Sequence, residues 1–178
     1  FFSIELLTTR GLILYMVLFV MDSETRNVQI AGIHTNPNGD WMKQVARNLT
    51  DSEEGFLRGK RFLILDRDPL FTKAFKAILK DGGVTAVPTA VAAPKMNAHA
   101  ERFVRAVKYE GLNKLILTNE AQLRYVLDEY LDYYHHERIH KGLGRIIEPR
   151  AEFGAVSGEI VCVERLGGLL KSYHRKAG

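Results

Sequence analysis

The chain has one cysteine among its 178 residues, and this scarcity excludes two kinds of stabilising chemistry. Cys162 has no second cysteine with which to form a disulfide within the chain, and it cannot build a zinc site from several thiolates. Such cysteine usage is typical of a reducing compartment. We expect Cys162 itself to be a small buried hydrophobic residue.

The chain also lacks a hydrophobic run long enough to span a bilayer. Its longest apolar stretch, residues 11–21, is bounded by Arg10 and Asp22, well short of the roughly 20 residues that a transmembrane helix needs. This stretch predicts a core strand, and we expect no membrane partner. The first residue is Phe1 rather than methionine, and no leader-like segment precedes the first expected strand, so we expect a longer reading frame.

Neither sign of charge is in large excess. The chain has 25 lysines and arginines against 21 aspartates and glutamates, which gives a net charge of +4 and a pI of about 9.2. These values suit a polyanionic partner, but many ordinary domains reach them, so charge alone does not identify nucleic acid as the partner. Hydrophobic residues make up 46% of the chain, enough for one sizeable core.

Short hydrophobic runs and turn residues predict the order of the elements. Strands are expected at residues 1–8, 12–21 and 27–34, and their short connections imply an antiparallel meander. Asp40 is expected to cap a helix that continues through Leu49. The later elements are a strand at 61–65, a helix at 70–79, a strand at 84–87, a loop at 88–96, and helices at about 97–111 and 120–136. This order is typical of a mixed sheet flanked by helices.

Two carboxylates lie where metal-dependent phosphoryl-transfer chemistry needs them. Asp66 closes the strand-like run at residues 61–65 and is followed by an Arg-Asp-Pro turn signal. Glu101 lies on a helix and shares its exposed stripe with Arg105 and Lys108. Carboxylates are the hard oxygen ligands of divalent cations, and neighbouring cationic side chains hold phosphates. These four residues therefore predict a site for a phosphodiester.

Each of these features also has a simpler explanation. Asp66 is a common kind of turn residue or helix cap, and Glu101 fits a solvated charged helix face. His135, His136 and His140 form a histidine cluster, but a zinc site would need further ligands, so a structural or DNA-facing role is expected for them. The local patterns leave these alternatives open, and the order of the motifs decides between them.

Three segments, in order, resemble the motifs of one family. Residues 65–72, Leu-Asp-Arg-Asp-Pro-Leu-Phe-Thr, resemble the second-aspartate motif of the integrase core in bacterial insertion-sequence transposases. Residues 94–103, Pro-Lys-Met-Asn-Ala-His-Ala-Glu-Arg-Phe, resemble the glutamate motif of this DDE family. Residues 133–143 resemble the aromatic, histidine and arginine signature that often follows. The resemblance covers roughly residues 1–150, and three ordered motifs are far more specific than any one of them.

The resemblance implies a ribonuclease H-like fold, an α/β fold with a mixed five-stranded sheet in which parallel strands follow an antiparallel three-strand meander, flanked by helices. It implies a DDE-type polynucleotidyl transferase that cleaves and joins DNA with Mg²⁺ or Mn²⁺ held by three acids. Asp66 and Glu101 would be the second and third catalytic and metal-binding acids. Asn97, Arg105 and Lys108 would contact DNA near them.

The first acid of this family lies in the first strand of the sheet. The matching position here is the residue immediately upstream of Phe1. Asp22 is a weaker stand-in as a metal ligand, because a hairpin that turns near Arg10 would bring it across from that position. Glu5 is a poorer stand-in still.

The resemblance also implies partners and an organisation. Residues 1–147 would be the integrase core catalytic domain and residues 148–178 a C-terminal tail of unassigned function. DNA, as transposon ends and target, is the expected partner, together with further copies of the chain in a homo-oligomer. An N-terminal DNA-binding domain outside this sequence and a bacterial, cytoplasmic, nucleoid-associated location are expected. Two alternatives stay open: a ribonuclease H-like nuclease without strand transfer, and a catalytically inactive DNA-binding remnant.

Overall fold

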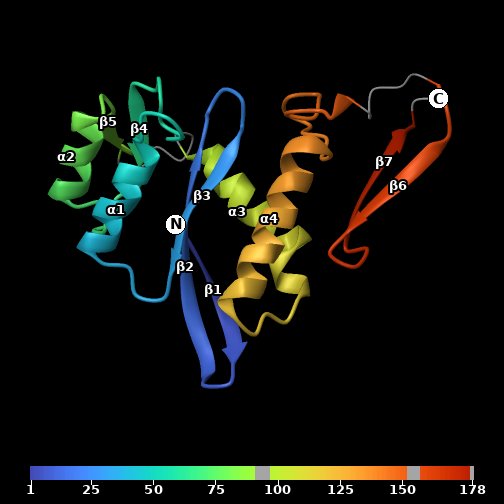
Figure 1. Cartoon of the computed structure of the whole chain (residues 1–178), viewed down its shortest axis with the longest axis horizontal. Helices are drawn as coiled ribbons and strands as arrows, with labels where there is room; N and C mark the ends of the chain where they lie inside the picture. The colour runs from blue at the N-terminus through green and yellow to red at the C-terminus, as the bar shows by residue number, and fades with distance from the viewer. Residues whose placement is uncertain (91–96, 152–156, 177–178) are drawn as a thin grey trace. The chain divides into compact units, whose positions relative to one another are not determined.

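The computed structural model describes residues 1–90, 97–151 and 157–176, and Figure 1 shows the order of their helices and strands. Contacts between residues divide the chain into two compact units. Unit 1 consists of Phe1–Glu5, Ile13–Val20 and Gln29–Arg102. Unit 2 consists of Leu6–Leu12, Met21–Val28 and Phe103–Gly178. The first three strands and the helix α3 (Ala98–Glu110) contribute residues to both units.

The N-terminal sheet contains three strands in the order β1-β2-β3. Strand β1 spans Phe2–Thr8, β2 spans Gly11–Met21 and β3 spans Val28–His34, each within one residue of the predicted start. The connection between β1 and β2 is too short for a parallel crossover, so the predicted meander is confirmed. Gly11 follows this turn with a φ of 99°, a conformation that glycine adopts without a steric cost.

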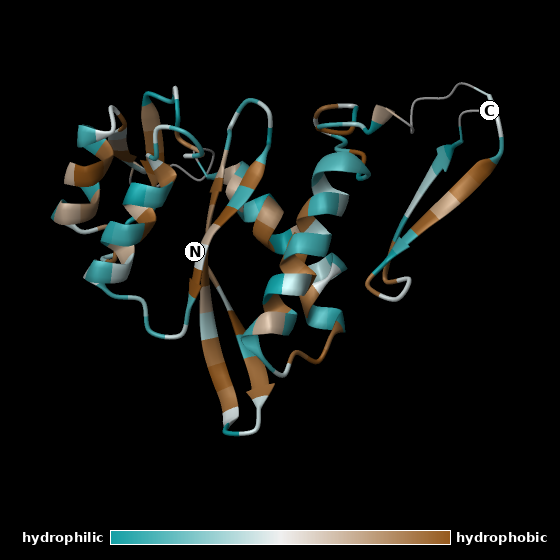
Figure 2. Cartoon of the chain, viewed as in Figure 1, coloured by the Kyte–Doolittle hydropathy of each residue, from teal (hydrophilic) through white to brown (hydrophobic). Residues whose placement is uncertain are grey.

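The core of unit 1 lies between a pair of helices and a pair of parallel strands. Helix α1 spans Gly39–Leu49, β4 spans Phe62–Leu65, α2 spans Lys73–Asp81 and β5 spans Thr85–Pro88. Strand β4 pairs in parallel with β5, with Leu63 opposite Ala86 and Leu65 opposite Pro88. The buried cluster that holds these elements together includes Met42, Val45, Leu49, Leu65, Phe75 and Leu79. Figure 2 shows the resulting alternation of hydrophobic and hydrophilic residues along both helices.

The starts of helices α1 and α2 differ from the prediction. Asn38, not Asp40, is the N-cap of α1: its Oδ1 accepts hydrogen bonds from the backbone N–H groups of Asp40 (3.0 Å) and Trp41 (2.9 Å). Helix α2 begins only at Lys73, because Thr72 is its N-cap and accepts from the backbone N–H of Phe75 at 3.2 Å. Both errors concern caps, where several short polar residues compete for one role.

Unit 2 is built around two helices, α3 (Ala98–Glu110) and α4 (Glu120–His136), joined through the short 3₁₀ helix η2 (Leu112–Lys114). The bounds of α4 are those predicted, and Asn119 caps it by accepting from the backbone N–H of Gln122. Fully buried side chains of this unit include Phe103, Val107, Leu112, Leu123, Leu127 and Tyr130. No helix in the described residues combines the length and apolar content needed to cross a membrane.

The C-terminal tail contains a hairpin that the sequence did not predict. Strand β6 (Ile160–Arg165) pairs antiparallel with β7 (Leu170–Arg175). Figure 2 shows β6 as mainly hydrophobic and β7 as mainly hydrophilic. Cys162 is exposed on β6, opposite Tyr173, so the expectation that it is buried is wrong. Side chains along a strand point to opposite faces in turn, and Cys162 lies on the solvent face of the hairpin.

Candidate active site

Asp66 lies at the carboxyl end of the parallel pair β4–β5, as predicted. Backbone hydrogen bonding continues past the strand, because Thr89 N–H donates to the carbonyl of Leu65 at 2.8 Å. Next to Asp66 in the chain, the Arg67 guanidinium donates through Nε to the carbonyl of Thr89 at 3.1 Å. These contacts fix the start of the turn at the strand edge where α/β sites form. The Asp66 side chain is 41% exposed, so it faces outward from the core.

A tight turn orients the Asp66 carboxylate. Its Oδ1 accepts from the backbone N–H of Asp68 at 3.2 Å, and the Asp68 Oδ1 in turn accepts from the backbone N–H of Leu70 at 2.8 Å. Asp68 is therefore a turn residue, as its place before proline suggests. Asp66 has one oxygen committed to the turn, and its Oδ2 accepts no hydrogen bond from any described residue.

The start of β1 lies beside Asp66. The main-chain nitrogen of Phe1 is 4.0 Å from the Asp66 Oδ2. The Phe1 ring is held there by the ring of Phe71, at a centroid separation of 5.5 Å, and Phe71 also contacts Phe75 of α2. Aromatic packing thus joins the first residue of the sequence to the helix that follows Asp66.

Glu101 lies in the first turn of α3, on an exposed position, as predicted. Its backbone N–H donates to the carbonyl of Asn97 at 3.0 Å, which places Asn97 at the helix start. Arg105 is exposed and Lys108 half-buried farther along the same helix, in the part that belongs to unit 2. No hydrogen bond or ion pair joins Glu101 to Asp66. Residues 91–96, which include part of the predicted 88–96 loop, lie outside the described residues.

The donor chemistry of Asp66 and Glu101 suits a hard divalent cation, because both are exposed carboxylates with oxygen available. Within the described part of the chain, no group of three His, Cys, Asp or Glu side chains is arranged to hold a metal ion. Asp66 and Glu101 both lie in unit 1.

Asp22 has a turn role. It follows β2, and its Oδ1 accepts from the backbone N–H groups of Glu24 (2.7 Å) and Thr25 (3.0 Å). Its backbone carbonyl also accepts from the N–H of Arg26 at 3.0 Å. This carboxylate closes the connection to β3 in unit 2, while Asp66 and Glu101 lie in unit 1.

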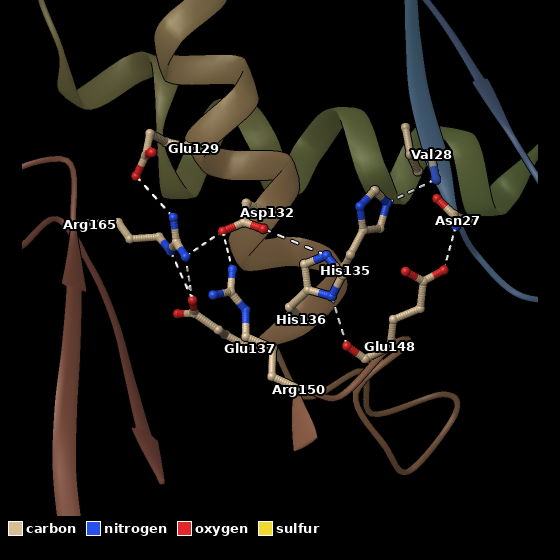
Figure 3. Close-up of polar contacts among 10 residues, drawn as sticks. All are labelled: Asn27, Val28, Glu129, Asp132, His135, His136, Glu137, Glu148, Arg150 and Arg165. Carbon is tan, nitrogen blue, oxygen red and sulfur yellow. Dashed lines mark hydrogen bonds and ion pairs between the residues drawn. The ribbon is translucent and has the colours of Figure 1, made fainter. Parts of the chain in front are cut away.

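The three clustered histidines are hydrogen-bonded within unit 2, and Figure 3 shows the contacts of two of them, His135 and His136. The His135 Nε2 accepts from the backbone N–H of Val28 at 3.0 Å, which requires a neutral ring. The His136 Nδ1 donates to the carbonyl of Glu148 at 2.8 Å, and the His140 Nε2 donates to the carbonyl of Tyr134 at 2.7 Å. Burial lowers the pKa of both His135 and His140. These contacts favour the structural role over the DNA-facing one.

A second polar cluster, which no sequence pattern predicts, binds the C-terminal hairpin to α4. Arg165 of β6 donates through Nε (2.9 Å) and Nη2 (2.7 Å) to the Glu137 Oε1, and through Nη1 to Glu129 at 3.1 Å. It also pairs with Asp132, which Arg150 contacts as well (Figure 3). The Glu137 side chain is only 1% exposed, so its charge is compensated almost entirely by protein groups.

Comparison with known proteins identifies the relatives of this chain. Residues 82–147 match the profile of a family described as an integrase core domain. The insertion element IS476 uncharacterized 39.2 kDa protein of Xanthomonas euvesicatoria is 30% identical over 139 residues, which are 78% of this chain and 38% of that protein. The chain therefore spans less than half the length of this curated relative.

Solved structures show the same fold. The HTLV-2 integrase catalytic core domain, in complex with magnesium in a trimeric form, matches with a TM-score of 0.57 at 9% identity, over 82% of this chain and 89% of that chain. The simian T-cell lymphotropic virus intasome in complex with the PP2A regulatory subunit B56 gamma matches with a TM-score of 0.59 at 10% identity, over 98% of this chain and 64% of that chain. The predicted ribonuclease H-like α/β fold is confirmed. Among the described residues, the five strands of the predicted sheet pair as β1-β2-β3 and as β4-β5 rather than as one continuous sheet.

Proposed function

The chain carries an integrase core domain, and on that premise we propose that it is the catalytic part of a DDE transposase that cleaves DNA strands and joins them to a target. The observation that carries this proposal is the position of Asp66 at the carboxyl end of β4, beside the start of β1, where the family has its acidic site. Cleavage and joining of DNA strands would make the protein act in DNA integration and recombination.

Asp66 and Glu101 would hold Mg²⁺ or Mn²⁺ through their exposed carboxylate oxygens. When bound, the cation polarises the phosphodiester and lowers the pKa of a water or 3′-hydroxyl nucleophile. The turn to Asp68 holds the Asp66 Oδ1 in place and leaves Oδ2 available. Arg105 and Lys108 would contact the DNA backbone, because they follow Glu101 along α3 at helical spacing. Asn97 would do so from the start of the helix, where its carbonyl accepts from the backbone N–H of Glu101.

The first acid of the site is proposed to be the residue that precedes Phe1 in the reading frame. A residue bonded to the Phe1 nitrogen has its backbone within a few ångströms of the Asp66 Oδ2, since that nitrogen is 4.0 Å away. Asp22 is the weaker proposal, because its Oδ1 already accepts two backbone hydrogen bonds.

The active form is proposed to be a homo-oligomer that holds two transposon ends and a target. Each copy is proposed to have an additional N-terminal DNA-binding domain. The proposed location is the bacterial cytoplasm, at the nucleoid. The trimeric form named for the HTLV-2 integrase catalytic core domain, which has the same fold, supports the homo-oligomer. The greater length of the curated relative, of which this chain covers 38%, leaves room for such a further domain.

The proposal is tested with the chain extended upstream in its reading frame, assayed for Mg²⁺-dependent cleavage and joining of the element's ends. Asp66→Asn and Glu101→Gln are expected to lower the rate on the order of 10³-fold, about 4 kcal/mol of transition-state stabilisation. Asp68→Asn is the matched control, because asparagine can still accept from the backbone N–H of Leu70. Unchanged activity in the first two variants would refute the site.

The reaction products separate strand transfer from the alternatives. Joined DNA supports the transposase, whereas hydrolysis of a branched DNA or an RNA–DNA hybrid without joining supports a nuclease on the same fold. Metal-independent DNA binding without turnover, with the upstream residues present, supports a non-catalytic remnant.

A further inference from the structure

The solvent face of α2 carries a row of three lysines. Lys73, Lys76 and Lys80 are all exposed, and their spacing places them along one side of the helix. The opposite side is the buried one, where Phe75 and Leu79 pack into the core of unit 1.

These lysines have no acidic partner among the residues that the structure describes. Some other cations do have one: Lys43 pairs with Asp40, Arg124 with Glu120 and Lys171 with Glu164. The lysines of α2 are therefore left uncompensated by local ion pairs, whereas Lys43 of the neighbouring helix α1 is paired with Asp40.

The row is unfavourable for the helix itself. Lys73 and Lys76 are three residues apart and Lys76 and Lys80 four, so like charges face one another. Lys73 is also the first residue of α2, whose first turn contains no acid, so a cation lies at the positive end of the helix dipole. Residues that destabilise the local structure are typical of functional positions, where the requirements of function outweigh those of stability.

The row begins close to Asp66 in the chain and within the same unit. A turn closed by the backbone bonds Phe71 N–H to Asp68 carbonyl (3.1 Å) and Thr72 N–H to Leu70 carbonyl (2.8 Å) leads directly from Asp66 to α2. At 1.5 Å per residue, the lysines extend along about 10 Å of helix. One strand of a duplex carries a phosphate about every 3.4 Å of helix axis, so this length, laid along that axis, spans roughly three nucleotides.

We propose that Lys73, Lys76 and Lys80 form a track that binds the phosphate backbone of duplex DNA next to the scissile phosphate. This inference rests on the proposed function, because it takes DNA as the partner. The contacts are to phosphates only, so the track fixes the position of the duplex independently of its sequence. Release of the counterions condensed on DNA drives the binding and makes it salt-dependent.

The test compares two triple variants of the full chain that remove the same charge. K73Q/K76Q/K80Q removes the track, and K114Q/K141Q/K176Q removes three exposed lysines outside unit 1. Affinity for a short duplex DNA is measured between 50 and 200 mM salt. The track variant is expected to bind on the order of 10- to 100-fold more weakly, with a log–log salt slope lower by about 2 to 3. The control variant is expected to keep most of the wild-type slope.

Folding does not confound this comparison. Glutamine is about as good a helix former as lysine, and its substitution removes the like-charge repulsion. The melting temperature of the track variant is expected to equal or exceed that of the wild type, and a marked drop would overturn the proposal by showing a structural role.

The failure of the track and that of the proposed function are distinguishable. Wild-type affinity and salt slope in the track variant, with DNA cleavage and joining intact, would refute the track and leave the transposase standing. Equal losses in both triple variants would refute it as well, because net charge alone would then explain binding. Absence of DNA binding in the wild-type chain would refute both.

Discussion

The main-chain nitrogen of Phe1 lies 4.0 Å from the Oδ2 of Asp66. With an aspartate as the residue upstream of Phe1, we predict that Mn²⁺ binds at least 10-fold more tightly to the extended chain than to a variant with asparagine there, because removal of a hard oxygen ligand weakens the site. Calorimetric titration with Mn²⁺ measures this difference.

The control for this prediction is Asp22→Asn. It keeps an acceptor for the N–H groups of Glu24 and Thr25, so the turn is expected to stay intact and metal affinity to stay unchanged. Loss of Mn²⁺ affinity in this variant, with none on replacing the upstream residue, would assign the first acid to Asp22 instead.

Local signals in the sequence were sufficient for most element positions. Helix α4 was predicted with its bounds, because one cap, Asn119, precedes an uninterrupted helical pattern. Helix α1 was predicted with the wrong cap, because both Asn38 and Asp40 are good N-cap residues and only the structure shows which one accepts the hydrogen bonds. The strand end at Asp66 and the helix position of Glu101 follow from equally local patterns.

Local sequence patterns could not predict contacts between residues that are far apart in the chain. Arg165 and Glu137 are 28 residues apart, and no periodicity connects a strand arginine to an acid at the end of a helix. In the same way, the approach of Phe1 to Asp66 depends on the packing of Phe1 against Phe71. The ordered motifs identified the family because a family resemblance records long-range arrangement that residue spacing alone does not.

Stability is predicted to fall as the solution becomes acidic, because His135 must stay neutral to accept from Val28 N–H. Burial lowers its pKa in the folded state, so below the ordinary value of about 6.5 the unfolded chain binds more protons. This contribution is present above pH 6.5 and is lost as the pH falls through the lowered folded-state pKa. His140, whose pKa is lowered in the same direction, adds to the effect.

Urea unfolding at pH 8, 6.5 and 5 measures this dependence. His135→Gln offers an amide oxygen to the Val28 N–H without titrating, so its stability is expected to depend less on pH than that of the wild type. A wild-type stability that stays constant or rises between pH 6.5 and 5 would contradict the role of both histidines.

The β6–β7 hairpin is predicted to loosen when its buried ion pair is broken. In Glu137→Ala, Arg165 keeps Glu129 and Asp132 but loses two charged hydrogen bonds, and Ser172 loses its acceptor. A local cost of about 2–3 kcal/mol is expected, equivalent to roughly 30- to 150-fold faster exchange of protected hairpin amides.

Hydrogen exchange resolved by peptide measures this effect, with residues 160–175 expected to exchange faster and residues 39–49 of unit 1 unchanged. Lys171→Gln is the control, because its pair with Glu164 is exposed to solvent and such pairs contribute little to stability. Equal protection of the hairpin in Glu137→Ala and in the wild type would show that Arg165 does not hold it in place.

Asn38→Ala is predicted to destabilise unit 1 by about 1 kcal/mol, because the backbone N–H groups of Asp40 and Trp41 lose their acceptor at the start of α1. For a chain of this size that corresponds to a melting temperature lower by about 2–4 °C.

Asn38→Asp keeps the acceptor and adds a negative charge at the helix N-terminus, so its stability is expected to equal that of the wild type or exceed it slightly. Asp40→Ala removes only an exposed pair with Lys43 and is expected to cost less than Asn38→Ala. Thermal unfolding of the three variants separates the two possible caps: a larger loss for Asp40→Ala than for Asn38→Ala would make Asp40 the effective cap.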